Sequence, residues 1–506
     1  MKIFIRYYLF LFIFVPLDVF SQGQGDTWCF GDSANIRLVG NNFINLPSCN
    51  LNSIESSASI SDMTGNLLFY CGGYSVSNYS YVNCFNNNHQ LLQNGDSIMG
   101  GQSVTNGLII IPFPDDSNKY YLFSRISSFG FGYNLYYSII DMSQNSGLGS
   151  VIQKNILLSN TEFAEKITAV KHGNGRDWWL LTHQFSFTTD INTFSIFLIT
   201  PLGISSPINQ SIGAFYNHNV PYDGFYGEIQ FSNSGNKLLA VGSDIIDLFD
   251  FNRCTGIISN HQNLAVNNPP TPLNGYYGCS FSPDASKIYI SNSNNGQTAN
   301  LSHQIFQMDL NSANIPASKT IIFSSTSQNI FIGQHQIARN NKIYIATSLG
   351  IGFPNSNYGT QNMNLSVINS PDSLGSACNY SSYSISLSGR RCYAGLPNLP
   401  NYNLGADEGS PCDTLLSLNN FQNQFNVSVY PNPTKDFLSI NYHFQPSHEI
   451  TFTLINSSGQ TVLSKILKPN STQQKINIKD LVEGIYFWKL TSENNFSSQG
   501  KIMFLK

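Results

Sequence analysis

A short unit that recurs along the chain constrains its fold more than any other feature. Each copy joins a polar turn, a residue such as Asn or Lys, and a short apolar run typical of a β-strand. Three or four strands fit into each period and no helical periodicity is present, so the pattern predicts the blades of a β-propeller. The copies are GNLLFY (65–70), SNKYYLF (117–123), GRDWWLL (175–181), GNKLLAV (235–241), SKIYIS (286–291) and NKIYIA (341–346).

The spacing of the copies predicts the number of blades. Measured at Asn66, Lys119, Asp177, Lys237, Lys287 and Lys342, it is 53, 58, 60, 50 and 55 residues. The residues outside these periods, from Trp28 to the first copy and from the last copy to about 405, supply close to one more blade. We therefore expect seven blades, the last shared between the N-terminal strands and a segment near 378–400, which leaves no open edge. Six blades with additional decoration is the alternative.

The composition agrees with an all-β protein. Only 11% of the residues are charged and 13% are aromatic, and the segments between apolar runs are rich in Asn, Ser and Gly. The net charge of −4 gives no electrostatic footprint for nucleic acid or an anionic membrane. A chain of 506 residues exceeds one ordinary core, so two or more units are expected.

The first residues have the pattern of a targeting segment. Lys2 and Arg6 flank the start of a short apolar run that ends near Val19, and small residues lead to Ser21. This pattern predicts a secretory signal peptide at 1–21, too short and too interrupted for a stable membrane span. The propeller is then assigned to 22–402, and the mature chain has no further membrane-spanning run.

The last eighty residues form a separate β pattern. A Ser/Asn/Gln-rich linker is expected at 403–426, followed by alternating strands over 427–506 that predict a small immunoglobulin-like β-sandwich. Its motifs are Tyr430-Pro431-Asn432-Pro433, a hairpin turn at Gly459, and Leu481, Gly484 and Tyr486 in a Leu-x-x-Gly-x-Tyr pattern.

These motifs, in this order at the end of the chain, closely resemble the type A C-terminal sorting domain of the type IX secretion system. The resemblance implies that the domain engages the type IX machinery. It also implies passage through the periplasm and outer membrane of a Gram-negative bacterium, with removal of the tail and release or attachment at the surface. An ordinary accessory sandwich domain is the alternative interpretation.

The propeller region carries a second resemblance, which covers about 27–405. Its motifs are Trp28-Cys29-Phe30-Gly31-Asp32, ASISDMTGNLLFY (58–70), EKITAVKHGNGRDWWLLTH (165–183) and Gly395-Leu396-Pro397-Asn398. They look like a group of secreted bacterial β-propeller proteins, and FSPDASKIYI (281–290) also resembles the surface-layer type of propeller repeat. The resemblance implies a fold more than an activity.

The chain has nine cysteines, so an exported protein would leave at least one thiol without a partner. Cys71/Cys84 and Cys378/Cys392 are close enough in sequence to join hairpins, although spacing does not fix the connectivity. No C-x-x-C motif occurs, and neither a metal site nor a cofactor is expected.

Aromatic residues in Gly/Asn-rich connections are the best candidates for a binding site. Tyr222, Phe225 and Tyr226 precede one strand motif, and Tyr276 and Tyr277 precede the next. Corresponding positions in adjacent blades would bring them together at the mouth of the propeller, where they would suit stacking against sugar rings or a peptide. Packing between blades is the competing role for the same side chains.

Catalytic signatures are scarce. Glu165 and Lys166 could form an acid/base cluster with His172 and His183, although pairing at a blade edge and hydrogen bonds between blades are the favoured roles. His303 and His335 lack further ligands at metal-binding spacing, and no G-x-S-x-G, P-loop or H-E-x-x-H motif is present. The sequence therefore favours a non-catalytic surface or secreted protein that binds polysaccharide or protein, with a secreted polysaccharide hydrolase or lyase as the alternative.

Overall fold

The structure is a computed structural model with two compact units, divided between Asp413 and Thr414. It describes residues 23–74, 80–126, 133–217, 224–265, 274–294, 302–327, 329–349, 357–413, 427–442, 450–456, 460–468, 472–492 and 497–505. The expected signal peptide at 1–21 lies outside these residues. In the described ranges, no helix has both the length and the apolar character that crossing a membrane requires.

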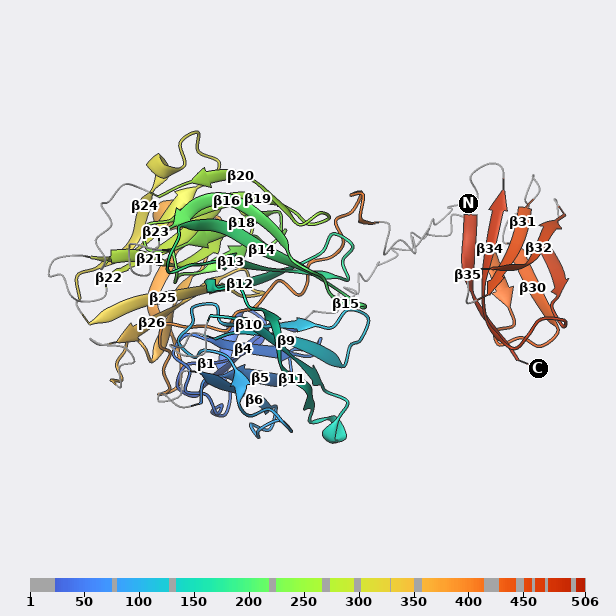
Figure 1. Ribbon diagram of the computed structural model, residues 1–506, viewed down its shortest axis with the longest axis horizontal. Helices are drawn as coiled ribbons and strands as arrows, with labels where there is room; N and C mark the ends of the chain where they lie inside the picture. Colours follow the sequence, from blue (N-terminus) through green and yellow to red (C-terminus); the bar gives the residue numbers. More distant parts are fainter. Residues whose placement is uncertain are drawn as a thin grey trace, which may run out of the picture. The chain divides into compact units, whose positions relative to one another are not determined.

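The first unit contains seven antiparallel sheets within its described residues, which we call blades 1 to 7 (Figure 1). Blade 1 has β4 (Ser57–Ser61), β5 (Leu67–Gly72), β6 (Tyr81–Asn86) and β7 (Ile98–Met99). Blade 2 has β8 (Leu108–Pro112), β9 (Lys119–Arg125), β10 (Leu135–Asp141) and β11 (Ser150–Ser159). Blade 3 has β12 (Phe163–Lys171), β13 (Trp178–Gln184), β14 (Ile191–Thr200), β15 (Gly203–Ile204) and β16 (Ile208–Tyr216).

The remaining blades follow in chain order, except that the last contains the first strands. Blade 4 has β17 (Ile229–Phe231), β18 (Lys237–Val241), β19 (Ile246–Asn252) and β20 (Ile257–Asn263). Blade 5 has β21 (Asn274–Phe281), β22 (Lys287–Asn294), β23 (His303–Asp309) and β24 (Thr320–Ser325). Blade 6 has β25 (Ile330–Ile337), β26 (Ile343–Leu349), β27 (Asn364–Ile368) and β28 (Tyr380–Ser386). Blade 7 has β1 (Thr27–Phe30), β2 (Ala34–Val39) and β3 (Asn42–Asn45).

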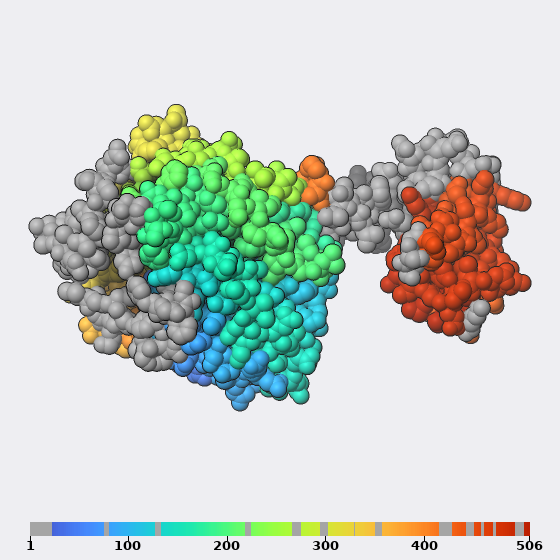
Figure 2. All heavy atoms as spheres, viewed as in Figure 1, coloured from blue at the N-terminus to red at the C-terminus, as the bar shows by residue number. Residues whose placement is uncertain are grey.

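Three short 3₁₀ helices, η1 (Asn145–Gly147), η2 (Pro316–Ser318) and η3 (Gly375–Cys378), lie in the connections of this unit. Apolar side chains from neighbouring blades form shared clusters. One cluster joins Val170 and Trp179 of blade 3 to Ile229 and Leu238 of blade 4. Figure 2 shows the third and fourth blades, in teal and green, packed against each other on the face drawn.

The ring is closed by a segment from the far end of the unit. The backbone N–H of Asp32 donates to Arg391, and Ser57 forms a parallel β-bridge with Pro397. Residues 391–397 therefore lie between blade 6 and blade 1, beside β1. The prediction of seven blades closed by the two ends of the unit is confirmed, and the alternative of six is wrong; the closing segment is 391–397, whereas β28 within the expected 378–400 belongs to blade 6.

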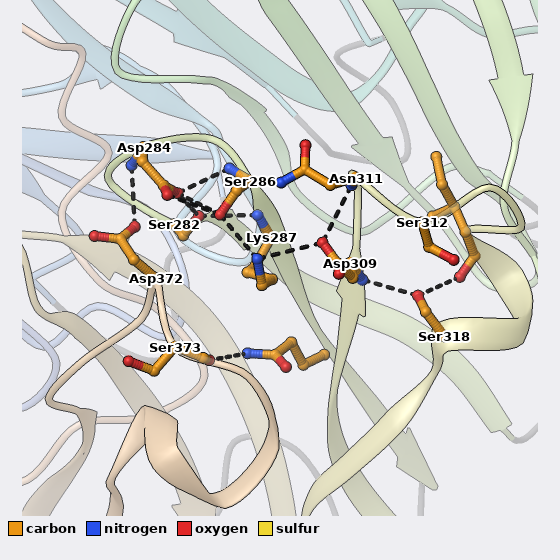
Figure 3. A network of polar contacts seen from close by, with 12 residues as sticks. Ser282, Asp284, Ser286, Lys287, Asp309, Asn311, Ser312, Ser318, Asp372 and Ser373 are labelled. Atoms are coloured by element: carbon orange, nitrogen blue, oxygen red, sulfur yellow. Dashed lines mark hydrogen bonds and ion pairs between the residues drawn. The ribbon is translucent and has the colours of Figure 1, made fainter.

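The polar turn of the recurring unit has a defined hydrogen-bond pattern in blade 5 (Figure 3). The Ser282 hydroxyl accepts a bond from the backbone of Lys287 at 2.9 Å and donates to Asp284 at 2.7 Å. Asp284 also accepts from the backbone N–H of Ser286 at 2.8 Å. The Lys287 ammonium group lies 3.2 Å from Asp309, its cross-strand partner on β23.

Blade 4 has the same arrangement at the corresponding residues. The Ser232 hydroxyl accepts from the backbone of Lys237 at 3.2 Å, and Lys237 lies 3.0 Å from Asp250, its cross-strand partner on β19. The serine fixes the turn and the lysine ties the second strand to the third. This explains why a Lys so often opens the apolar run.

Two disulfides hold the first unit. Cys71–Cys84 joins directly paired residues of β5 and β6, as the spacing allowed. Cys254–Cys412 joins blade 4 to the end of the unit, whereas Cys378 and Cys392 are buried free thiols. A Cys378–Cys392 disulfide, which the spacing also allowed, does not form, because Cys392 lies in the closing segment and its thiol faces the backbone oxygens of Thr347 and Asn362.

Residues 398–412, which we call the strap, continue from the closing segment across the ends of the inner strands. Asn398 donates to Ile167 O at 2.9 Å, Asn401 to Asn233 O at 2.8 Å, and the Tyr402 hydroxyl to Ile110 O at 2.9 Å. The backbone of Asp407 donates to Gly173 O at 2.8 Å. Part of the stretch 403–426, assigned from the sequence to the linker, is thus attached to the first unit.

The second unit is a two-sheet β-sandwich, as the sequence predicted. One sheet has the order β29-β30-β33 and the other β32-β31-β34-β35. Its core contains Leu438, Ile450, Phe452, Trp488 and Phe504. The strands are β29 (Val427–Tyr430), β30 (Phe437–Tyr442), β31 (Ile450–Asn456), β32 (Thr461–Leu467), β33 (Gln473–Asn477), β34 (Gly484–Ser492) and β35 (Ser497–Phe504).

The Tyr430-Pro431-Asn432-Pro433 motif holds the last strand. The Asn432 amide donates to Lys501 O at 3.0 Å and accepts from the backbone N–H of Met503 at 2.9 Å. The backbone of Thr434 continues the pairing with Met503 O at 2.8 Å. Tyr486 donates its hydroxyl to Val482 O at 2.6 Å, and Leu481 packs on the core, whereas Gly459 lies outside the described residues.

Replacing Asn432 by Ala tests this contact. We expect Asn432→Ala to destabilise the second unit by about 1–3 kcal/mol, because it removes two hydrogen bonds to the backbone of β35. Hydrogen exchange should show the Met503 amide exchanging faster. Asn477→Ala, which removes only an exposed turn contact with Lys479, is the control. Equal protection of Met503 in both variants would contradict the role of Asn432.

Candidate functional site

The inner strands of the blades bring a set of polar residues together on the propeller axis. Glu55 and Thr105 precede β4 and β8, Glu165 lies on β12, Glu228 directly precedes β17, and Tyr277 and Gln334 lie on β21 and β25. We call these six residues the axial cluster. In β12, β21 and β25 the residues lie at β-bulges, between Phe163/Ile167, Tyr276/Cys279 and Ile332/His335. A bulge frees backbone groups from the strand ladder and turns them toward the axis.

The freed backbone groups bond to the next blade. Six such bonds link blades 1–2, 2–3, 3–4, 4–5, 6–7 and 7–1, and the Ser291 hydroxyl donates to Gly333 O at 3.2 Å between blades 5 and 6. The close approach requires glycine: a Cβ on Gly333 or Gly395 would collide with the carbonyl oxygen of Ala394 or Glu55. The bonds are Glu55 N to Gln102 O (2.9 Å), Asn106 N to Glu165 O (3.2 Å), Glu165 N to Phe225 O (2.8 Å), Glu228 N to Tyr277 O (2.9 Å), Gln334 N to Ala394 O (2.8 Å) and Gly395 N to Ile54 O (3.2 Å).

Glu55 is the first buried carboxyl group of the cluster. Its oxygens accept a bond from the Ser103 hydroxyl at 2.8 Å and one from the Tyr277 hydroxyl. Burial, together with the charge of Glu165, raises the pKa of Glu55 to about 7. Burial and the neighbouring Glu55 also raise the pKa of Tyr277, so its phenol stays protonated and acts as the donor.

Glu165, on β12, is the second buried carboxyl group of the cluster. One carboxylate oxygen accepts from the backbone N–H of Thr105 at 3.0 Å and from its hydroxyl at 3.1 Å. The other lies 3.7 Å from the guanidinium of Arg125, which also donates to Phe163 O at 3.0 Å. Burial raises the pKa of Glu165, and the charge of Arg125 opposes that shift.

Glu228 bridges three blades. One of its oxygens accepts from the backbone N–H of Cys279 at 2.7 Å and from that of His335 at 3.0 Å. Burial raises the pKa of Glu228 to about 8, because only 2% of the residue is exposed and no cation pairs with it in the described chain. The Glu228 carboxyl group therefore serves to hold β21 and β25 in place, and it is too buried to contact a ligand.

Lys166 follows Glu165 on β12 and is also fully buried. Its ammonium group donates to Gly224 O at 2.6 Å and Tyr226 O at 2.7 Å, so it holds the segment that precedes blade 4. The sequence favoured a pair of Glu165 and Lys166 at a blade edge; β12 is the edge strand of its sheet, and the charge of Lys166 counteracts the rise in the pKa of Glu165. Both residues lie on β12, the innermost strand of blade 3.

The structure brings two of the five predicted binding residues together at the axis. The rings of Tyr226 and Tyr277 have centroids 6.4 Å apart, and the Ser243 hydroxyl donates to the Tyr226 hydroxyl at 3.0 Å. Tyr226 is partly exposed, whereas Tyr277 is buried. Tyr222 lies outside the described residues.

The other two predicted residues are buried between blades. The Arg125 guanidinium lies 4.8 Å from the Phe225 ring centroid, and Tyr276 packs edge-on against Phe306 at 5.8 Å. Their part in ligand binding stays a prediction. Of the four predicted binding residues that the structure describes, Tyr226 is the one with a partly exposed ring.

The histidines have structural surroundings. His172 contacts Cys254 O at 3.0 Å, across from blade 3 to blade 4, and His183 stacks on Tyr216 with centroids 3.7 Å apart. Burial lowers the pKa of His183 and of His335 to about 3, so both are neutral at physiological pH. His303 is also buried. Among the residues that the structure describes, no group of three or more His, Cys, Asp or Glu is placed to hold a metal ion.

Sequence reasoning missed Glu55 and Glu228. The available signal was their position, since each is a carboxyl group within two residues of the start of an inner strand in a chain with only 11% charged residues. Together with Tyr277 and Gln334, they give the axis hydrogen-bond donors and acceptors beside a partly exposed aromatic ring. This arrangement can bind a neutral polar ligand, and the buried acids can hold or release a proton near neutral pH.

The raised pKa of Glu228 predicts how stability depends on pH. Its pKa rises from 4.5 in the unfolded chain to about 8 in the folded one, so the folded state binds more protons between these values and loses stability as pH increases. His335 acts in the opposite direction, but only up to its unfolded pKa of 6.5. Between pH 6.5 and 8 the carboxyl groups therefore dominate.

We expect Glu228→Gln to flatten this dependence. Its contribution to the slope is at most about 1.4 kcal/mol per pH unit, because one proton is involved. Urea unfolding between pH 6.5 and 8 measures the slope, with Glu408→Gln at an exposed position as the control. An unchanged slope in Glu228→Gln would show that Glu228 is already ionised in the folded protein.

Comparison with known proteins identifies the second unit. Residues 428–504 match the family described as the secretion system C-terminal sorting domain. No curated protein matches the chain in sequence.

Among solved structures, the first unit is similar to proteins of low sequence identity. A putative 6-phosphogluconolactonase from Bacteroides uniformis is 12% identical, with 63% of this chain and 89% of that chain covered and a TM-score of 0.40. The periplasmic gluconolactonase PpgL of Pseudomonas aeruginosa is 11% identical, with 83% and 99% covered and a TM-score of 0.36. A functionally unknown protein from Desulfotomaculum acetoxidans is 12% identical, with 74% and 99% covered and a TM-score of 0.40.

The sheet order of the first unit and the family match of the second lead to one conclusion. The chain is a β-propeller protein with a type IX secretion system sorting domain at its C-terminus, and it is secreted or displayed at the cell surface.

Proposed function

We propose that the propeller is a non-catalytic binding domain for an extracellular polysaccharide, which the sorting domain carries out of the cell. The observation that carries the proposal is the Tyr226 ring, partly exposed and 6.4 Å from Tyr277 beside the axial cluster. An aromatic face next to amide and carboxyl groups stacks on a sugar ring and bonds its hydroxyls.

The state of the axial carboxyl groups supports binding over catalysis. Glu55, Glu165 and Glu228 each accept hydrogen bonds from protein groups, mostly from neighbouring blades. Such groups position strands, and a catalytic acid or base needs an open path to the bond it acts on.

A secreted hydrolase or lyase is the second candidate, and one observation favours it. Glu55, with a pKa raised to about 7, contacts the Tyr277 hydroxyl and is influenced by the charge of Glu165. Two carboxyl groups and a phenol at one place are the equipment for acid/base cleavage of a polysaccharide.

Affinity electrophoresis of the purified chain, in gels that contain single extracellular polysaccharides, tests the binding proposal. We expect one polymer to retard the protein and Tyr226→Ala to reduce that retardation at least tenfold in apparent affinity, because it removes the stacking surface. Tyr136→Ala, a partly exposed tyrosine on β10 away from the axis, is the control.

Two outcomes would contradict the binding proposal. Equal retardation of Tyr226→Ala and wild-type protein would exclude this site. New chain ends in the retained polymer, produced by wild-type protein and not by Glu55→Gln, would replace the proposal with the second candidate.

Removal of residues 427–506 tests the export route. We expect the shortened chain to accumulate in the periplasm of the producing bacterium, since the segment that engages the secretion machinery is missing. Fractionation with an antibody against the propeller locates it. The shortened chain at the cell surface or in the medium would show that another segment directs export.

A further inference from the structure

A polar cavity lies where the inner strands β12, β17 and β25 end. Its volume is about 250 Å³. It is lined by the ends of β12, β17 and β25, by Gly25 and Asp26, and by residues 398–403 of the strap. We call it the basal cavity. Every residue that lines it is described, and none belongs to the axial cluster.

The basal cavity carries no net charge. Asp26 and Arg339 are the charged residues of its lining. They pair with each other, with guanidinium nitrogens 2.9 and 2.7 Å from the two carboxylate oxygens of Asp26. Because this bidentate pair satisfies both charges, the cavity fits a neutral ligand better than a cation or an anion.

Three of the lining amides have side-chain oxygens that accept no hydrogen bond from the residues that the structure describes, whereas the oxygen of Asn401 accepts one from the backbone of Asn403 at 3.0 Å. Gln230 donates its NH₂ group to His335 O at 2.6 Å, Gln336 donates to Ile337 O at 3.0 Å, and Asn398 donates to Ile167 O at 2.9 Å. No hydrogen bond within the described chain reaches the side-chain oxygen of these three residues, and none of the three oxygens is sealed from solvent. The cavity therefore presents three neutral acceptors, which match the hydroxyl donors of a polyol.

The same cavity has apolar surface from Phe231, Leu399, Pro400 and Tyr402. The hydroxyl of Tyr402 is already donated to Ile110 O at 2.9 Å, so its ring is fixed in place. A sugar ring has apolar C–H faces and hydroxyl edges, and both kinds of surface are present here.

The volume agrees with a ligand of this size. A cavity of about 150 Å³ accommodates benzene, so 250 Å³ accommodates one six-membered sugar ring. We propose that the basal cavity is a binding site for a single neutral sugar ring, formed jointly by the inner strands and the strap. This site is separate from the one around Tyr226 and goes beyond the function proposed for it.

The experiment is saturation-transfer NMR of the full chain with D-glucose, D-galactose, D-mannose, D-xylose and N-acetyl-D-glucosamine, each tested alone. We expect at least one sugar to bind. Gln336→Leu should weaken that binding about tenfold or more, since it replaces an acceptor by an apolar group of similar size. Gln304→Leu on β23, outside the cavity, should leave the binding unchanged, and thermal unfolding checks that both variants are folded.

Two variants together separate this proposal from the function proposed for the site around Tyr226. Tyr226→Ala should not change sugar binding in the basal cavity, and Gln336→Leu should not change retardation by a polysaccharide at the mouth. The proposal is overturned if none of the five sugars binds, or if Gln336→Leu binds a sugar as tightly as wild-type protein. Binding of Ca²⁺ alone, tested by titration, would also overturn it, because the amide oxygens would then serve a cation.

Discussion

The propeller depends on backbone hydrogen bonds that cross from blade to blade at the axis. The bulges in β12, β21 and β25 remove N–H and C=O groups from their own ladders, and a buried group of this kind without a partner costs about 1–3 kcal/mol. The neighbouring blade supplies each partner, for example Glu228 N to Tyr277 O at 2.9 Å. Adjacent blades therefore stabilise one another by specific bonds as well as apolar packing. The closing segment is a necessary part of the ring, because Gly395 N and Ala394 O complete the bonds to blades 1 and 6.

The buried carboxyl groups follow from the same constraint. Some backbone N–H groups near the axis bond to a carboxylate oxygen instead of a carbonyl oxygen. Glu228 accepts from the N–H groups of Cys279 and His335, and Glu165 accepts from that of Thr105. Their burial has a cost, which is visible in their raised pKa values. Glu55 is different, since its partners are the hydroxyls of Ser103 and Tyr277 and no backbone group. A ligand could therefore replace the hydrogen bonds of the Glu55 carboxyl group without breaking any backbone bond between blades. Glu55 is the one of the three acids that belongs both to the axial cluster and to the candidate binding site.

The sequence predicted the parts of the fold that rest on local patterns. The polar turns and apolar runs located the second strand of six blades, and the spacing of about 55 residues between them predicted seven blades in total. The motif at Tyr430–Pro433 located the sorting domain, although the bonds from Asn432 to β35 need the structure. The axial cluster could not be predicted, because Tyr277 and Glu55 are 222 residues apart and no pattern links them. Proximity in sequence also misled, since Cys254 pairs with Cys412 across 158 residues while Cys378 and Cys392 stay free.

The ends of the first unit explain why the strap is attached so firmly. Closing the ring brings Ile54 and Gly395 together. Because these residues are far apart in the sequence, loop closure between them costs chain entropy and is slow. The innermost position beside β1 stays empty until the closing segment binds there. The strap adds contacts to blades 2, 3 and 4 directly after that segment, and the Cys254–Cys412 disulfide fixes its end. A disulfide placed there keeps the closing segment near its site even when its hydrogen bonds open briefly. All of these contacts lie before Asp413, so residues of the first unit itself close the ring and hold the strap in place.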